Sequence, residues 1–481
     1  MNHAVLARHD SRLVVPRAVV RHGDTVLADA TDLRIAPGEP LTVIGESGSG
    51  KSVLAHALLG TLPPELAAEG SVTIGDATFD LADRDGRRHL WGRRLALLPQ
   101  EPSQALDPTM RVRGQVAEGA AGWRPRSAAA LELADRRLGQ LGLGEVGASY
   151  PHTLSGGMAQ RVAFAAATIG GAEVLVVDEP SKGLDPDSLD QLADLLLAHV
   201  AAGGLLLTIT HDLRLARRLG GQVAVMRRAT IVETGPTEQV LSSPADPYTR
   251  RLLGTEPARW AFPWLRPGRQ VAPTGEPVVL ADRISKAYGA VRLFEDLSVE
   301  LRPGERLALT GPSGVGKTTL GNALLRLTRV DSGTVRHSPA TASGRLQKLY
   351  QDPGLSFPPR VPLRVALQDV VRRHRVDGRR TADLLERVDL PPTILGRRPG
   401  QVSGGELQRI AVVRAMLPQP ALVMADEATS RLDLATQADT MDLLMSEVDA
   451  SGCAVLLVTH DQQLATAVAD RDLRLEPPRA G

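Results

Sequence analysis

The two stretches PGEPLTVIGESGSGKS, at residues 37–52, and PGERLALTGPSGVGKT, at residues 303–318, are copies of one pattern set 266 residues apart. In each copy a short apolar run leads into a glycine-rich loop that closes with Lys-Ser or Lys-Thr. A strand that enters such a loop, followed by a helix, is the P-loop pattern, in which backbone N–H groups surround phosphate oxygens. A sequence that repeats itself in this way predicts two similar units in one chain.

Further landmarks recur in the same order in both halves. The interval from Gly156 to Asp178 is 22 residues, and the interval from Gly404 to Asp426 is also 22 residues. Such agreement is not expected by chance. The matching segments are LLPQEP (97–102) with LYQDP (349–353), LSGGMAQR (154–161) with VSGGELQR (402–409), VLVVDEPSKGLD (174–185) with LVMADEATSRLD (422–433), and TITHD (208–212) with LVTHD (457–461).

The fold class follows from the alternation of short β-branched apolar runs with helical patterns, which is typical of parallel α/β sheets. Strands are expected where the apolar runs stand, and helices where each P-loop ends. The expected strands are 41–44, 174–177 and 205–210 in the first half and 307–310, 422–425 and 454–459 in the second; the expected helices are 51–59 and 317–325.

The predicted organisation is a first domain at 1–255, a proline-rich linker at 256–277 and a second domain at 278–481. Prolines throughout the linker argue against a helix and favour an extended, semi-rigid connector. Its aromatic residues are expected to pin it to one domain, and a partner-binding aromatic patch is the alternative. These aromatic residues are Trp260, Phe262 and Trp264.

Composition excludes several functions. The 481 residues carry 56 basic and 55 acidic side chains, a balance that does not indicate a nucleic-acid partner. The single cysteine, Cys453, excludes a disulfide framework or a multi-cysteine metal site within the chain and is expected to fill the core. The apolar runs are too short to span a bilayer and the N-terminus does not resemble a signal peptide. We therefore expect a cytoplasmic chain that reaches any membrane through a partner.

The two loops predict ATP and Mg²⁺ as cofactors. Lys51 and Lys317 are expected to reach the β- and γ-phosphates, and the hydroxyls of Ser52 and Thr318 to bind Mg²⁺. A glycine-rich structural turn is the alternative, but both loops stand between a strand and a helix, where the mechanism needs them. The glycines expected to admit backbone N–H groups to the phosphates are Gly45, Gly48, Gly50, Gly311, Gly314 and Gly316.

Acidic pairs close one buried strand in each half. Asp178 and Asp426 are expected to hold Mg²⁺ beside the P-loops. Glu179 and Glu427 come next and are expected to polarise the attacking water; a surface glutamate is the alternative reading. The histidines His211 and His460 end another strand in each half, and we interpret them as γ-phosphate sensors rather than structural histidines.

The segments LSGGMAQR and VSGGELQR resemble the signature of the ATP-binding cassette superfamily, and the resemblance covers about 1–255 and 278–476. It implies α/β P-loop NTPase domains, each with a mainly parallel sheet, a helical subdomain and an N-terminal antiparallel β part. It also implies that two cassettes stack head to tail, here as an intramolecular dimer, so that each signature serves the other cassette's ATP. The signature residues are Ser155, Gly156, Gly157, Ser403, Gly404 and Gly405.

Other roles come from the same resemblance. Gln100 and Gln351 are similar to the glutamines that touch Mg²⁺ and water and relay to the membrane partner. Tyr288 stands where the family stacks an aromatic ring on adenine, and the 266-residue offset gives His22 as its counterpart, which is a departure. The residues similar to the loop aspartates that couple the two sites are Asp185 and Asp433.

Three segments of the first half, 97–112, 150–162 and 232–253, resemble the importer ATPases for dipeptides, oligopeptides and nickel. This implies an ATP-hydrolysing motor at the cytoplasmic face of a membrane, with two transmembrane permease subunits and an extracytoplasmic solute-binding protein. Those importers usually keep the two ATPases on separate chains, so the fusion is a departure. A soluble tandem cassette that acts on ribosomes and an exporter motor are the alternatives, and the transported solute is not determined by this sequence.

Overall fold

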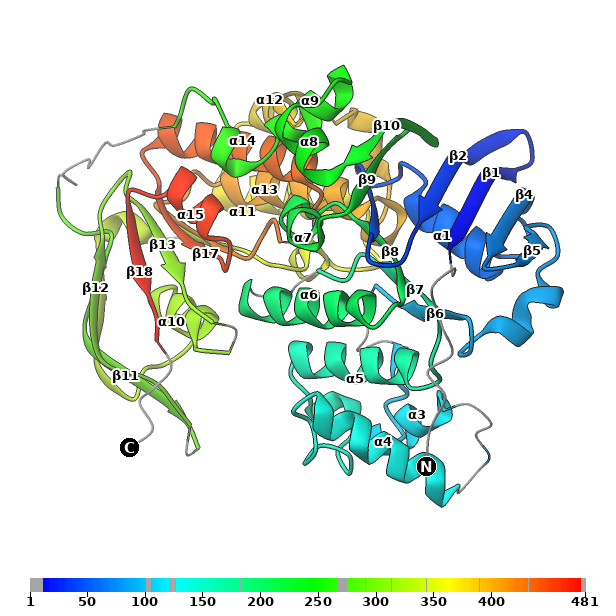
Figure 1. Cartoon of the computed structure of the whole chain (residues 1–481). Coiled ribbons are helices and arrows are strands. Elements are labelled where there is room, and N and C mark those ends of the chain that lie inside the picture. The colour runs from blue at the N-terminus through cyan, green and yellow to red at the C-terminus, as the bar shows by residue number, and fades with distance from the viewer. Residues whose placement is uncertain are drawn as a thin grey trace. The chain divides into compact units, whose positions relative to one another are not determined.

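The computed structural model describes residues 12–476, apart from 101–104, 121–123, 125–126, 182–183, 185, 266–274, 290, 313, 343, 389 and 431. The chain divides into two compact units, Met1–Leu253 and Gly254–Gly481. Figure 1 shows the helices and strands of both units, most of them labelled. No helix in the described ranges has the length and apolar character needed to cross a bilayer.

The first unit is built on a ten-stranded sheet in the order β5-β4-β1-β2-β10-β9-β3-β8-β7-β6. The part β9-β3-β8-β7-β6 is parallel, whereas β5-β4-β1-β2 is antiparallel. This arrangement confirms the predicted combination of a parallel sheet with an N-terminal antiparallel part. The strands are β1 (Leu13–His22), β2 (Thr25–Ile35), β3 (Leu41–Ile44), β4 (Ala67–Ile74), β5 (Ala77–Asp80), β6 (Leu95–Leu98), β7 (Val174–Asp178), β8 (Leu205–Thr210), β9 (Gln222–Arg227) and β10 (Thr230–Pro236).

The helices of the first unit pack in two groups. Helix α1 packs on the sheet in one hydrophobic core. Helices α3, α4 and α5 lie together as a helical subdomain in Figure 1, and their buried apolar residues belong to a second core. The helices are α1 (Lys51–Leu59), α3 (Val112–Glu118), α4 (Ala128–Gln140), α5 (Gly156–Thr168), α6 (Pro186–Ala201), α7 (Leu213–Leu219), α8 (Thr237–Ser242) and α9 (Pro247–Gly254).

The second unit repeats this design with two separate sheets. A three-stranded antiparallel sheet has the order β12-β11-β14, and a five-stranded parallel sheet has the order β15-β16-β17-β13-β18. Its strands are β11 (Val279–Tyr288), β12 (Val291–Leu301), β13 (Arg306–Thr310), β14 (Ser332–His337), β15 (Leu346–Leu349), β16 (Leu422–Asp426), β17 (Ala454–Val458) and β18 (Arg471–Arg474). Its helices are α10 (Lys317–Leu324), α11 (Leu363–His374), α12 (Arg379–Arg387), α13 (Gly404–Met416), α14 (Leu434–Ser451) and α15 (Gln462–Val468).

The central strands of both parallel sheets are buried along their whole length. Every residue of β7, β8, β16 and β17 is buried, which explains why these strands read as continuous apolar runs. In a parallel sheet the carboxyl ends of the strands meet at one edge. The P-loops, the Asp-Glu pairs and the histidines all follow such ends, so each sheet brings its own set together.

The segment before the second antiparallel sheet belongs to the second unit. Trp260 and Trp264 are 9% and 4% exposed and join its hydrophobic core. The Nε1 atom of Trp264 donates to Asp442 at 2.7 Å, and the buried guanidinium of Arg306 donates to the Trp264 carbonyl at 3.0 Å. The expectation that these aromatic residues pin the segment to one unit is therefore confirmed.

The structure corrects one local prediction, at Pro257–Arg259, and agrees with another, at Cys453. Pro257–Arg259 forms a short 3₁₀ turn where an extended connector was expected, because proline is well tolerated in the first turn of a helix. Residues 266–274 of the predicted linker lie outside the described part of the chain. Cys453 is buried, and burial raises the pKa of its thiol to about 12, as expected for a core residue.

Candidate functional site

The first P-loop joins the end of β3 to the start of α1. Gly50, at the N-terminus of α1, has a φ of 104°, and a Cβ added to it would lie 2.2 Å from the Leu27 carbonyl oxygen. Gly316 adopts nearly the same conformation, with a φ of 105°, at the start of α10. Glycine adopts this left-handed conformation without steric strain. The glycine just before the lysine therefore allows the tight turn from the loop into the helix.

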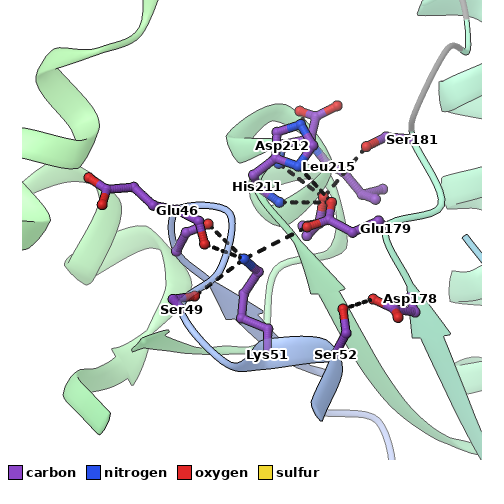
Figure 2. A network of polar contacts seen from close by, with 12 residues as sticks. Glu46, Ser49, Lys51, Ser52, Asp178, Glu179, Ser181, His211, Asp212 and Leu215 are labelled. Carbon is purple, nitrogen blue, oxygen red and sulfur yellow. Dashed lines mark hydrogen bonds and ion pairs between the residues drawn. The ribbon is translucent and has the colours of Figure 1, made fainter. Parts of the chain in front are cut away.

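Lys51 is buried and folded back over its own loop. Its Nζ donates to the carbonyl oxygens of Gly45 and Glu46, both at 2.9 Å, and lies 3.8 Å from Glu179 (Figure 2). Lys317 makes the corresponding contacts at 2.8 Å with Gly311 and Pro312. Both ammonium groups are therefore held at the loops, where the motif predicts a phosphate chain.

The predicted metal ligands come together in each unit. The Ser52 hydroxyl donates to Oδ1 of Asp178 at 2.9 Å, and the Thr318 hydroxyl donates to Oδ1 of Asp426 at 2.8 Å. Burial raises the pKa of Asp178, and the Ser52 hydrogen bond offsets this only in part. A hard divalent cation would stabilise this buried carboxylate in its charged form, and hydroxyl and carboxylate oxygens are the ligands that Mg²⁺ prefers. The residues present therefore fit Mg²⁺.

The rest of a metal's coordination must come from the nucleotide and water. Within the part of the chain that the structure describes, no three His, Cys, Asp or Glu side chains gather as a self-contained metal centre. Mg²⁺ is commonly held by one or two protein oxygens together with substrate phosphates. A serine or threonine hydroxyl beside one aspartate is consistent with that pattern.

Glu179 follows β7 in a strained conformation, with a φ of 44°, and its side chain meets His211. The Nδ1 atom of His211 lies 2.7 Å from Oε2 of Glu179, and the His211 backbone N–H donates to the same oxygen at 3.2 Å (Figure 2). Burial alone would raise the pKa of Glu179, but the His211 hydrogen bond and charge, with Lys51, lower it. Burial likewise opposes the charged form of His211, yet the contact with Glu179 raises the His211 pKa. Both effects favour a charged pair.

Glu427 has the same backbone conformation, with a φ of 47°, but different neighbours. The Gln351 amide donates to Oε2 of Glu427 at 3.0 Å and to the Ser430 hydroxyl at 3.3 Å. Nδ1 of His460 lies 3.3 Å from Oε1 of Glu427. The structure thus brings the predicted glutamine, glutamate and histidine of the second unit into one cluster.

The remaining predicted loop residues are placed less completely. Gln100 is exposed after the end of β6, and the residues that follow it at 101–104 lie outside the described chain. Asp185 also lies outside the described residues. Asp433 begins α14, where its carboxylate accepts from the Thr436 backbone N–H at 3.0 Å.

Comparison with known proteins agrees with this geometry. The family model described as ABC transporter matches residues 28–182 and 294–430. The chain belongs to the ABC transporter family. It is 34% identical to the peptidoglycan transport ATP-binding protein YejF of Agrobacterium fabrum (strain C58), over 93% of this chain and 87% of that protein. It is also 34% identical to the glutathione import ATP-binding protein GsiA of Shigella dysenteriae serotype 1, over 90% of this chain and 79% of that protein.

A solved structure of RNase-L Inhibitor has a TM-score of 0.67 with this chain at 21% identity and covers 95% of this chain and 88% of its own. At that identity the likeness concerns the fold alone. Family membership makes this chain an ATP-binding cassette ATPase whose hydrolysis is coupled to transport. The similarity to YejF and GsiA runs through both halves, so the fusion of two cassettes, a departure from separate-chain importers, is shared with these relatives.

The ABC signature stands at a helix start in both cassettes. The hydroxyls of Ser155 and Ser403 cap α5 and α13 by accepting from backbone N–H groups three residues on, each at 3.3 Å. In the second cassette Glu406 also accepts from the Ser403 backbone N–H at 2.7 Å and completes a capping box. Gly156 and Gly157, like Gly404 and Gly405, form the first turn, where backbone N–H groups have no partner within the helix and can bind an anion.

The two predicted adenine contacts occupy corresponding places in equivalent hairpins of the two units. His22 pairs with Thr25 at the turn from β1 to β2, and Tyr288 pairs with Val291 at the turn from β11 to β12. Tyr288 is 55% exposed and lines a cavity of about 340 Å³ together with Leu293, Gly314, Gly316, Lys317, Thr318, Thr319 and Glu427. The equivalence of His22 and Tyr288 in the hairpin supports the 266-residue offset at this position. Their contact with adenine stays a prediction.

The sequence analysis missed two residues at the sites. The hydroxyl of Tyr248 accepts from the Glu46 backbone N–H at 3.3 Å, so the C-terminal helix α9 of the first unit contacts the first P-loop. Lys348, on β15, forms an ion pair with Asp426. Tyr248 lies within residues 232–253, whose resemblance to the importer ATPases does not itself predict a contact with the P-loop. A signal for Lys348 existed, because it is a charged residue in a short, otherwise strand-like run.

Proposed function

We propose that the chain is the ATP-hydrolysing motor of an importer for small peptides or peptide-containing solutes. It would act at the cytoplasmic face of a membrane with two permease subunits and an extracytoplasmic solute-binding protein. The observation that carries the proposal is the 34% identity to YejF and GsiA across at least 90% of this chain. One relative is named for peptidoglycan transport and the other for glutathione, which is a tripeptide.

The proposed chemistry uses the same roles in both cassettes. Lys51 and Lys317 would bind the phosphate chain, and the carboxylates of Glu179 and Glu427 would orient and polarise the attacking water. His211 and His460 would sense the γ-phosphate, and the contacts described above would also position those glutamates. When bound, Mg²⁺ at Ser52–Asp178 and at Thr318–Asp426 would neutralise charge on the β- and γ-phosphates.

The proposed working unit is an intramolecular cassette dimer. Each signature, built on Ser155 or Ser403, would present helix N-terminal N–H groups to the γ-phosphate held by the other P-loop. ATP would then hold the cassettes closed, and loss of the γ-phosphate would release them. Gln100 and Gln351 would transmit this change to the permease subunits.

Two other functions remain as outcomes of the test. A role on ribosomes would agree with the likeness to a solved structure of the archaeal ribosome recycling factor aABCE1, which has a TM-score of 0.68 with this chain at 21% identity, but that likeness concerns the fold alone. The importer is favoured because the relatives at 34% identity are named for transport or import. An exporter motor would share every residue of the ATP sites, so only the direction of transport separates the two.

The test is reconstitution of the full chain in proteoliposomes with the permease and binding-protein candidates encoded beside its gene. We expect ATP-dependent uptake of a labelled di- or tripeptide when the binding protein is present, and no uptake by the Glu179→Gln, Glu427→Gln double variant. Nickel and glutathione are tested as competing solutes. Solute movement in the opposite direction, or ATPase activity stimulated by ribosomes and not by the permeases, would contradict the proposal.

A further inference from the structure

The two ATP sites differ beside the aspartate that is proposed to hold Mg²⁺. In the second cassette Nζ of Lys348 lies 2.9 Å from Oδ2 of Asp426, and both side chains are 10% exposed. Oδ1 of the same aspartate accepts from the Thr318 hydroxyl. The two oxygens of Asp426 are thus engaged by a hydroxyl and by an ammonium group.

The corresponding position of the first cassette is apolar. Leu97 pairs with Val176 on β7, and Lys348 pairs with Met424 on β16. Val176 and Met424 each stand two residues before the aspartate, so Leu97 and Lys348 occupy the same register. Leu97 packs against the hydrophobic core of the first unit. A lysine in one site therefore replaces a partly buried leucine in the other.

Lys348 is held by two further contacts that the first cassette does not repeat. Its Nζ donates to Oδ1 of Asn322 at 2.9 Å and lies 5.0 Å from the centre of the Tyr350 ring. The residues at the corresponding positions of the first cassette are His56 and Pro99. Three residues thus differ together: in the second cassette Lys348 carries the ammonium group at Asp426, and Asn322 and Tyr350 hold it there.

We propose that Lys348 is a positioning residue that makes the second ATP site bind its divalent cation more weakly than the first. This inference rests on the proposed metal role of Asp426. A buried ammonium group in contact with the carboxylate offsets the negative charge that attracts the cation, and two cations at one carboxylate repel each other. The first site has Leu97 at this position, so no ammonium group from the neighbouring strand offsets the charge of Asp178.

The consequence is an order of loading. At limiting Mg²⁺ the first site is occupied by metal and nucleotide before the second. The second site then responds to Mg²⁺ over a higher concentration range, so the fully loaded chain forms only when Mg²⁺ is abundant. The two sites would remain competent for hydrolysis but would differ in the metal concentration that each requires.

The test measures metal binding directly, using Mn²⁺ as the probe and a non-hydrolysable ATP analogue. Bound Mn²⁺ is followed by electron paramagnetic resonance in the full chain, with Lys51→Ala to isolate the second site and Lys317→Ala to isolate the first. We expect the second site to half-saturate at an Mn²⁺ concentration about tenfold higher than the first, because the positive charge of Lys348 repels a cation bound at Asp426. Lys348→Met should lower that concentration about tenfold, whereas Lys348→Arg, which keeps the charge, should not.

Control variants separate the possible failures. Asp426→Asn should weaken Mn²⁺ binding at the second site whatever Lys348 does. If Asp426→Asn weakens binding but Lys348→Met changes it less than twofold, the inference is wrong and the metal role of Asp426 stands. If Asp426→Asn has no effect, both are wrong. The reciprocal Leu97→Lys variant should weaken Mn²⁺ binding at the first site, and thermal unfolding of each variant shows whether the chain is folded.

Discussion

Nδ1 of His211 lies 2.7 Å from Oε2 of Glu179, whereas Nδ1 of His460 lies 3.3 Å from Oε1 of Glu427. The first pair lies at the ends of β7 and β8, and the second pair lies after the corresponding strands β16 and β17. The closer pair raises the pKa of His211 and lowers the pKa of Glu179. The first cassette therefore carries a charged pair, and the contribution of this pair to the stability of the folded chain depends on pH.

The sign of this dependence follows from linkage between protonation and folding. The raised pKa of His211 stabilises the folded chain below the ordinary histidine value of about 6.5, and that stabilisation is lost as the pH rises through the raised pKa. The lowered pKa of Glu179 stabilises the folded chain above the ordinary glutamate value of about 4.3, and that stabilisation is lost as the pH falls through the lowered pKa. Both contributions are present together near pH 6.

We expect His211→Gln to destabilise the first cassette by about 1.5–3 kcal/mol near pH 6, the range for a hydrogen bond to a charged group, and by less at pH 9. Calorimetric unfolding of the full chain across this range measures the difference. In a Glu179→Gln background the pH-dependent part should disappear. An equal cost of His211→Gln at pH 6 and pH 9 would show that the pair is not charged.

Both cassettes should hydrolyse ATP, because each has an intact P-loop and a glutamate placed after a buried strand. Glu179→Gln alone and Glu427→Gln alone should each lower turnover about tenfold or more, since loss of a general base typically costs more than this, and each should leave ATP trapped on the chain. Phosphate release and retained nucleotide measure the two effects. Glu173→Gln, which changes the residue just before the start of β7, is the matched control for Glu179→Gln. Unchanged turnover in one variant would make that site structural only.

The two sites should differ in nucleotide affinity, because an imidazole offers a smaller stacking surface than a phenol ring. His22→Tyr should strengthen binding at the first site by up to about 1 kcal/mol, and Tyr288→Ala should weaken binding at the second by about 1–3 kcal/mol. Each site is measured with the other P-loop disabled by Lys317→Ala or Lys51→Ala. If His22→Tyr and His22→Ala both leave affinity unchanged, His22 does not contact adenine.

The segment before the second antiparallel sheet should contribute strongly to the stability of the second cassette. Trp264 fills the core and its carbonyl accepts from Arg306, which also donates to Asp449 at 2.6 Å and is 1% exposed. Trp264→Ala should cost about 3–5 kcal/mol, as for other buried aromatic residues. Phe262→Ala, at a partly buried position, should cost less. Urea unfolding of the full chain measures both, and equal costs would contradict this account of the segment.

ATP should close the chain on itself rather than pair two chains. The two cassettes are consecutive units of one chain, so each has a high effective concentration for the other, which favours an intramolecular dimer. Cysteines introduced at Ser49 and Ser403, in a Cys453→Ser background, should crosslink within one chain when ATP is bound. The same variant with Lys51→Ala and Lys317→Ala should crosslink poorly. A crosslink that joins two chains would favour a dimer of fused proteins.

The sequence by itself determined the repeat, the strand ends and the chemistry that follows them. The runs before Gly45, Asp178 and His211 are apolar because their strands are buried on both faces, and a parallel sheet gathers their ends at one edge. The P-loop turn depends on glycines within a few residues of each other. Local patterns of this kind can be read from the sequence because the physical constraint acts over a short stretch.

Only the tertiary structure decided which distant side chains complete each site. Lys348 reaches Asp426 because β15 lies beside β16 in a fixed register, although 78 positions separate the two residues in the sequence. Tyr248 reaches the first P-loop, and Trp264 reaches Arg306, across intervals that no periodic pattern marks. These contacts depend on strand order and on how helices and connecting segments pack against the sheets. A lysine in a short strand and a tryptophan in a proline-rich segment acquire their roles only when the chain has folded around them.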